Sequence, residues 1–116
     1  MRHSMRLTAA PFDAIESGRK TIELRLWDEK RQRIAVGDEI EFCHADDAGR
    51  RLVCRVIALH RFDSFDTLYS YLPLDKCGYT EGELATASPR DMEKYYAPED
   101  IRRLGVVGID LERIHT

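Results

Sequence analysis

The stretch Gly18-Arg19-Lys20-Thr21-Ile22-Glu23-Leu24-Arg25-Leu26-Trp27 decides the fold of this chain. Glycine adopts a positive φ without a Cβ clash, so Gly18 predicts the end of a helix. From Thr21 onward the residues alternate, which predicts a strand. Its apolar side chains are expected to face the core: Ile22, Leu24 and Leu26. The alternate side chains are expected to form a water-accessible polar face, with Lys20 at its entry: Thr21, Glu23, Arg25 and Trp27.

Four spaced positions of this stretch carry a family resemblance. Gly18-x-Lys20-x-x-Glu23-x-Arg25 resembles the G-x-K-x-x-E-x-R signature of ASCH domains, which belong to the PUA-like superfamily. The Gly37-Asp38 turn and a hydrophobic strand near the C-terminus also fit, so the resemblance covers most of the chain. It implies an α+β fold, a small PUA-like mixed β-barrel flanked by short helices.

Length and composition indicate one globular domain over residues 1–116. Hydrophobic residues make up 43% of the chain and charged residues 34%, which is typical of a folded protein rather than a disordered one. No apolar run approaches the roughly 20 residues of a membrane span, so we expect no membrane partner and a cytoplasmic location. The odd number of cysteines, without paired spacing, predicts buried, reduced thiols: Cys43, Cys54 and Cys77.

The charge of the chain is unevenly distributed. The net charge is −3, which argues against indiscriminate binding to long polyanions. Residues 1–36 nevertheless hold 8 Lys and Arg against 5 Asp and Glu, whereas the remainder holds 10 against 16. A basic region on an acidic body favours a small, shaped nucleic-acid target over a long duplex. The alternative is that this split arose by chance.

Periodicity and turn residues predict the other elements. Strands are expected over residues 5–8, 39–43, 52–59 and 106–111, with a hairpin loop over 46–49. The nearly continuous apolar sequence over 52–59 predicts a strand covered on both faces. Helices are expected up to Gly18, from Ser64 to Pro73, from Ser88 and over 97–104. Residues 74–86 are expected to be irregular, and whether they form a lid is left open.

The charged run over residues 28–33, Asp-Glu-Lys-Arg-Gln-Arg, allows two interpretations. Such a run is typical of a solvated face formed by a loop or a single helical turn. The alternative is that Lys30, Arg31 and Arg33 flank a nucleic-acid groove and contact phosphates.

The ASCH resemblance implies RNA binding in a cleft beside the barrel, where the signature side chains project. Arg25 suits bidentate contacts to a phosphate or a base edge, and Lys20 suits a phosphate. Trp27 and a tyrosine could stack an unpaired base. Of Tyr69, Tyr71, Tyr95 and Tyr96, the last two are selected together with Thr21 and Glu23 as ligand-binding candidates. The alternatives are a structural ion-pair network and a Trp27 that only covers the core edge.

Some relatives of the resembled family are enzymes, so an enzymatic role is left open. One bacterial branch hydrolyses N4-acetylcytidine with a Lys, a Thr and a Glu, and other relatives are reported to cleave RNA. Lys20 matches the lysine, but Glu23 occupies the place of the threonine, and Thr21 could replace it only in a rearranged site. The later glutamate would be Glu83 or Glu93.

The alternative function is therefore a small hydrolase acting on a modified cytidine or on RNA, with Lys20 and Glu23 transferring protons. His44 and His60 are alternative proton carriers, although histidines at strand ends are more often surface or hydrogen-bonded residues. The spacing of Cys43 and Cys54 with these histidines does not indicate zinc. No metal and no cofactor are expected, and the oligomeric state is left open.

Overall fold

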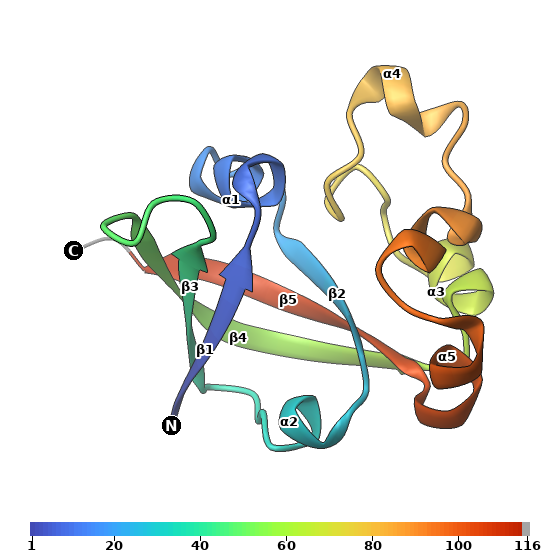
Figure 1. The fold of residues 1–116 in the computed structure, drawn as a ribbon, viewed down its shortest axis with the longest axis horizontal. Coiled ribbons are helices and arrows are strands. Elements are labelled where there is room, and N and C mark those ends of the chain that lie inside the picture. The colour runs from blue at the N-terminus through green and yellow to red at the C-terminus, as the bar shows by residue number, and fades with distance from the viewer. Residues whose placement is uncertain (115–116) are drawn as a thin grey trace.

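The computed structural model describes residues 1–114, and its five strands form one mixed sheet flanked by short helices (Figure 1). The strands are β1 (Arg2–Leu7), β2 (Ile22–Leu26), β3 (Glu39–His44), β4 (Arg51–Phe62) and β5 (Val106–Ile114). The helices are α1 (Ala9–Glu16), α2 (Glu29–Gln32), α3 (Phe65–Tyr71), α4 (Glu81–Leu84), the 3₁₀ helix η1 (Pro89–Lys94) and α5 (Pro98–Leu104). The predicted α+β architecture is confirmed.

The sheet curls into a half-barrel whose two edges are β1 and β2. The strand order is β1-β3-β4-β5-β2, with β1 parallel to β3 and the other pairs antiparallel. An irregularity in β4 between Val56 and Ala58 helps the long strand to bend. Figure 1 shows α3 and α5 gathered where β4 ends and β5 begins. The two edge strands define a seam between β1 and β2.

Strand β2 is buried on both faces. Ile22, Leu24 and Leu26 pack with α3 and Val106 in one hydrophobic cluster, so the prediction that this apolar set is buried is correct. The alternate face carries Glu23, which is only 4% exposed.

The expectation of a water-accessible polar face is therefore wrong at Glu23. This residue lies opposite Ile109, and Arg25 lies opposite Val107. Ile109 and Val107 belong to the cluster that fills the half-barrel. Curvature of the sheet turns this face of β2 toward the barrel interior, and α3 covers the other face.

Over residues 51–57, strand β4 is covered on one face only, so the prediction that both faces are covered is wrong there. Cys54 and Val56 are fully buried inside the half-barrel, whereas Arg55 is exposed and Ile57 is 47% exposed. The helices cover the far end of β4 and leave its outer face to solvent. The apolar run therefore reflects β-propensity on an exposed face as well as burial.

Two helical segments differ from the predictions. Residues 74–86 contain α4, because Glu83 Oε1 accepts the Thr80 N–H at 2.8 Å and starts the helix with a capping box. The segment after Ser88 has a similar box, in which Asp91 Oδ2 accepts the Ser88 N–H, but it continues as a 3₁₀ helix. Such helices are typical of short connectors. No helix within residues 1–114 is long and apolar enough to cross a membrane.

The three cysteines are free thiols. Cys54 and Cys77 are buried as predicted, and burial raises the pKa of their thiols to about 11 and about 12, respectively. Cys43 is half-buried, contrary to the prediction, because it lies on the solvent side of β3.

Gly105 joins α5 to β5, and its substitution tests this connection. Its φ of 74° and ψ of −174° lie in a region reserved for glycine, and an added Cβ would lie 3.0 Å from the Phe62 carbonyl oxygen. We expect Gly105→Ala to lower the free energy of unfolding by about 1–3 kcal/mol, measured by urea denaturation. Gly82→Ala is the matched control, because Gly82 has open space around it. Equal stability of the two variants would contradict this assignment.

Candidate functional site

A buried carboxylate and a guanidinium of β2 form an ion-pair triad with the lysine that precedes this strand. Lys20 Nζ lies 2.8 Å from Glu23 Oε1, and Arg25 Nε donates to Glu23 Oε2 at 2.6 Å. The side chains of Lys20, Glu23 and Arg25 are 10%, 5% and 16% exposed. Strand alternation points Glu23 and Arg25 the same way, and Gly18, with φ of 86°, ends α1 just before Lys20. The structure thus brings three predicted site residues together.

The two cations keep Glu23 ionised despite its burial. Burial alone would raise the pKa of Glu23, but the charges of Lys20 and Arg25 and their hydrogen bonds outweigh it, so the pKa is lowered. Burial would likewise lower the pKa of Arg25, whereas the charge of Glu23 raises it above its ordinary value. The triad therefore carries a net charge of +1.

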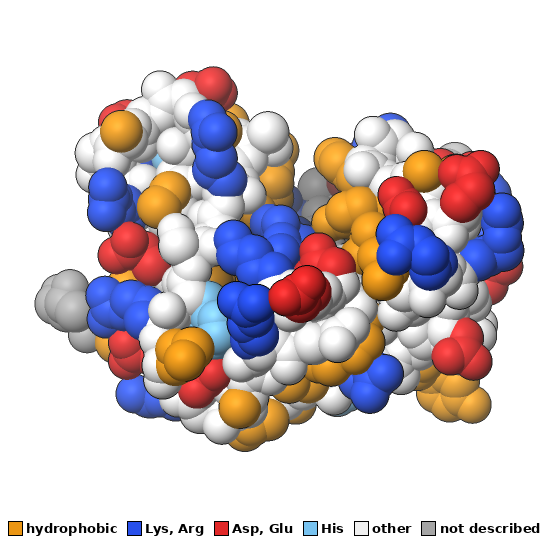
Figure 2. Space-filling view, turned by 60° about the horizontal axis from the view of Figure 1, so that its bottom comes forward, with side chains coloured by type: hydrophobic (Ala, Val, Ile, Leu, Met, Phe, Trp, Pro, Cys, Tyr) orange, Lys and Arg blue, Asp and Glu red, His pale blue; other side chains and the backbone are white. Residues whose placement is uncertain are grey.

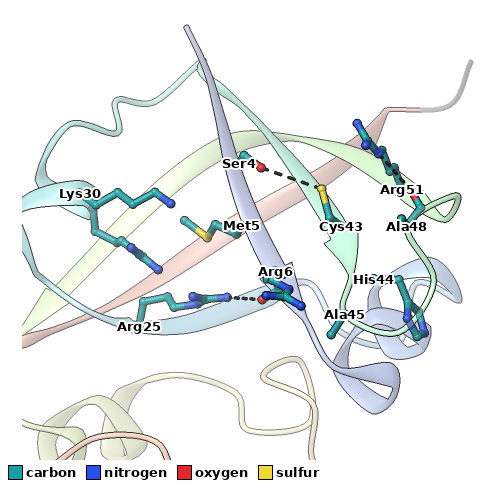
Figure 3. A pocket seen from close by; sticks show the side chains of 11 residues that line it. Ser4, Met5, Arg6, Arg25, Lys30, Cys43, His44, Ala45, Ala48 and Arg51 are labelled. Carbon is teal, nitrogen blue, oxygen red and sulfur yellow. Dashed lines mark hydrogen bonds between the residues drawn. The ribbon is translucent and has the colours of Figure 1, made fainter.

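Arg25 also joins the two edges of the half-barrel. Its Nη2 donates to the carbonyl oxygen of Arg6 at 3.2 Å, so a side chain of β2 satisfies a backbone acceptor of the edge strand β1. Figure 3 shows this bond across the seam. Arg25 therefore closes the seam with one end of its guanidinium and holds Glu23 with the other.

The segment before α4 covers Lys20. The Lys76 carbonyl oxygen accepts the N–H groups of Thr21 and Ile22 at 2.9 and 3.0 Å. Arg19 donates to the Gly78 carbonyl oxygen at 2.9 Å, and a Cβ at Gly78 would lie 3.3 Å from Lys20 Cδ. These contacts anchor the segment at the start of β2 and account for the low exposure of Lys20.

Within residues 1–114, the other hydrolytic candidates form no side-chain hydrogen bond or ion pair with the triad. The Thr21 hydroxyl has no hydrogen-bond partner within residues 1–114. Glu83 is occupied in the capping box of α4, and Glu93 Oε2 lies 3.1 Å from Arg90 Nε. In the described part of the chain, neither glutamate forms an ion pair with Lys20.

A cationic groove of about 530 Å³ opens on the β1 side of Arg25. Five cationic residues line it: Arg6, Arg25, Lys30, Arg31 and Arg51. Among the described residues, no Asp or Glu lines this groove. Its other lining residues are Ser4, Met5, Cys43, His44, Ala45 and Ala48. Figure 2 shows Lys and Arg side chains gathered in the hollow between two lobes, and Figure 3 shows lining side chains on both sides of β1. This surface attracts anions.

The predicted aromatic residues do not line the cationic groove. Trp27 packs against the barrel core beneath Arg61, whose Cζ lies 4.6 Å from its ring centroid, and it lines a separate depression of about 240 Å³. Tyr96 stacks on Phe65 with ring centroids 6.3 Å apart. Burial raises the pKa of Tyr96, and the charge of Arg25 offsets part of that rise. Tyr95 is 64% exposed.

Several groove residues were not among the selected candidates. Lys30 and Arg31 line the groove, as the alternative interpretation of the charged run requires, but Arg33 pairs with Glu29 and does not line it. Arg6 and Arg51 belong to no sequence motif that would predict a binding role. The only local hint for Arg6 is its outward place between two apolar strand residues, and nothing local connects it with Arg25.

The two histidines considered as proton carriers lie outside the triad. His44 Nδ1 accepts the Asp46 N–H at 3.1 Å, and its ring packs edge-on against Phe12. His60 Nε2 lies 3.5 Å from Asp110 Oδ2. Among residues 1–114, no three His, Cys, Asp or Glu side chains group as metal ligands.

Replacing Glu23 tests whether the triad holds the fold together. Removing one member of a buried ion pair costs about 3–5 kcal/mol, so Glu23→Gln should be strongly destabilised at pH 7. Because folding lowers the pKa of Glu23, its contribution is present above the unfolded pKa of about 4.3 and is lost as the pH falls through the folded pKa. The difference between wild type and variant, measured by urea denaturation, should therefore shrink in acid.

Glu29→Gln provides the matched control for this substitution, because Glu29 is 86% exposed and pairs with Arg33 at the surface. Its effect should stay within about 0.5 kcal/mol. A Glu23→Gln variant as stable as Glu29→Gln at pH 7 would contradict the structural role of the triad.

Comparison with known proteins identifies the family and the fold of this chain. Residues 5–115 match the family model of the ASCH domain. The crystal structure of the hypothetical protein PH0355 has a TM-score of 0.80 and 29% identity, covering 98% of this chain and 100% of that chain. Protein PF0455 from Pyrococcus furiosus has a TM-score of 0.74 and 29% identity, covering each chain completely.

More distant structures share the fold alone. The S128A mutant of an ASCH protein from Zymomonas mobilis has a TM-score of 0.64 and 18% identity, covering 98% of this chain and 73% of that chain. No curated protein matches this chain significantly. Because the family model spans nearly all of its residues, the chain belongs to the ASCH domain family.

Proposed function

We propose that this ASCH domain is an RNA-binding module that holds a short single-stranded segment, or a modified nucleotide, in the cationic groove. ASCH domains are generally thought to bind RNA. The observation that carries the proposal is a groove with five cationic residues and, within residues 1–114, no lining carboxylate. Arg25 links this groove to the family signature.

The size and chemistry of the groove suit a nucleotide. Its volume of about 530 Å³ falls within the usual range of small-molecule sites, about 300–1,000 Å³. Arg6 and Lys30 form no ion pair with the described residues, so their charges are available to phosphates. Between the cations lie small or apolar side chains, such as Met5, Ala45 and Ala48, which leave room for a sugar or a base.

The signature residues would then divide their roles. Lys20 and Glu23 are nearly buried and bonded to each other, so they would position Arg25 rather than contact the RNA directly. Arg25 reaches the groove and would contact a phosphate or a base edge. Tyr96 stacks on Phe65 and does not line the groove, so no base-stacking role is assigned to it.

The hydrolytic alternative has weaker support from this geometry. Proton transfer near neutral pH needs a group whose pKa lies close to that pH, but Glu23 has a lowered pKa and is ionised beside two cations. Lys20 donates to Glu23 and is covered by Gly78. Neither Glu83 nor Glu93 pairs with this lysine among residues 1–114.

Substituting Arg6 tests the groove directly. Arg6→Gln removes one groove cation while keeping the backbone carbonyl that accepts the bond from Arg25. A lost phosphate contact lowers the salt slope by about 0.7 on single-stranded RNA, so affinity should fall about fivefold near 0.1 M salt. Fluorescence anisotropy with a short single-stranded RNA across a salt series measures both quantities.

Arg102→Gln serves as the control, because it removes the same charge from α5, outside the groove. It should leave the affinity within about twofold of wild type. If Arg6→Gln and Arg102→Gln bind RNA equally well, the groove is not the binding surface.

A further inference from the structure

One donor of the Arg31 guanidinium, Nε–H, is buried and unsatisfied within residues 1–114. Arg31 is 9% exposed, and its Nε has no hydrogen-bond partner within residues 1–114. Its nearest carboxylate contact, from Nη1 to Asp28 Oδ2, is 3.6 Å long and exceeds hydrogen-bond distance. Asp28 is already used elsewhere, since its Oδ1 accepts the Arg31 backbone N–H at 3.0 Å as the cap of α2. A buried guanidinium without full partners is costly.

A second guanidinium close by adds to this cost. Burial lowers the pKa of Arg31, and the positive charge of Arg25 lowers it further, with Asp28 only partly compensating. Arg25 is itself held in place by Glu23 and by the Arg6 carbonyl, so it cannot simply turn away. Two like charges thus line the same groove, where a bound anion would be stabilised by both.

We propose that the guanidinium groups of Arg31 and Arg25, which both line the cationic groove, together form a phosphate seat there. Lys30, also a lining residue, adds a further positive charge at the seat. Arginine favours this role because its planar fork matches phosphate geometry. The inference rests on the proposed function for the source of the phosphate, which is either an internal phosphodiester of RNA or a terminal phosphate.

Inorganic phosphate tests the seat without RNA. Phosphate is titrated against chloride at constant ionic strength while the midpoint of thermal unfolding of the full chain is followed. Wild type should be stabilised by phosphate, and Arg31→Gln should weaken the apparent affinity at least about tenfold. Arg33→Gln is the matched control on the same helical turn, because Arg33 is 68% exposed and pairs with Glu29. It should respond like wild type.

Two results would overturn the seat. One is a wild type that gains no more stability from phosphate than from chloride, and the other is equal responses of Arg31→Gln and Arg33→Gln. If Arg31→Gln does not fold, the Nε–Hε resonance of Arg31 in wild type provides the test. This resonance should shift as phosphate is added, and an unmoved resonance also overturns the seat.

Trinucleotides with a 5′-phosphate or a 5′-hydroxyl identify the source of the phosphate. Tighter binding of the phosphorylated form would assign a terminal phosphate, and equal binding an internal phosphodiester. Either pattern supports the seat if Arg31→Gln weakens the binding. Phosphate binding without RNA binding would contradict the proposed function and leave the seat standing. RNA binding that is insensitive to Arg31→Gln would contradict the seat and leave the proposed function standing.

Discussion

The burial of the Glu23 carboxylate between Lys20 and Arg25 is the constraint on which the rest of this structure depends. A carboxylate that is 4% exposed stays ionised only because two cations contact its two oxygens. This arrangement fixes the direction of the Arg25 side chain, whose far end then reaches the carbonyl of Arg6. One buried charge thereby connects the interior of the half-barrel to the seam between β1 and β2.

The same constraint places a guanidinium at the wall of the cationic groove. In the proposed function, the signature strand both stabilises the fold and presents one residue to a ligand. Lys20 and Glu23 would serve the first purpose, since neighbouring residues cover them, and Arg25, which lines the groove, would serve both. The remaining groove charges come from β1, α2 and β4, which meet only because the sheet curls. The positive surface is local, which is consistent with an acidic chain overall.

Local patterns predicted much of the fold. Alternation located β2, Gly18 ended α1, and the α+β class followed from the resemblance carried by the signature. The exposure of each face could not be predicted in the same way. The pattern around Glu23 is that of a half-exposed strand, but α3 and the barrel interior cover both faces through contacts distant in sequence. The opposite error occurred at β4, where an apolar run predicted burial on both faces but the outer face is exposed at Arg55 and Ile57.

The site was predictable only where its residues are close together in the sequence. The signature indicated Lys20, Glu23 and Arg25, and their contacts follow from strand alternation and a helix end. Arg6 lies 19 residues before Arg25, and only the parallel pairing of β1 with β3 brings its strand to the seam. Trp27 shares the strand face of Arg25, but Arg61 covers its ring. Partners contributed by other strands are not encoded in local periodicity.

The central claim is that RNA occupies the groove closed by Arg25, and amide chemical-shift mapping of the labelled protein with a short single-stranded RNA tests it most directly. The largest shifts should fall on residues 4–6, 30–31 and 43–45, which line the groove from three elements. Shifts confined to α4 and the surface around Tyr95, with these groove amides unmoved, would contradict it.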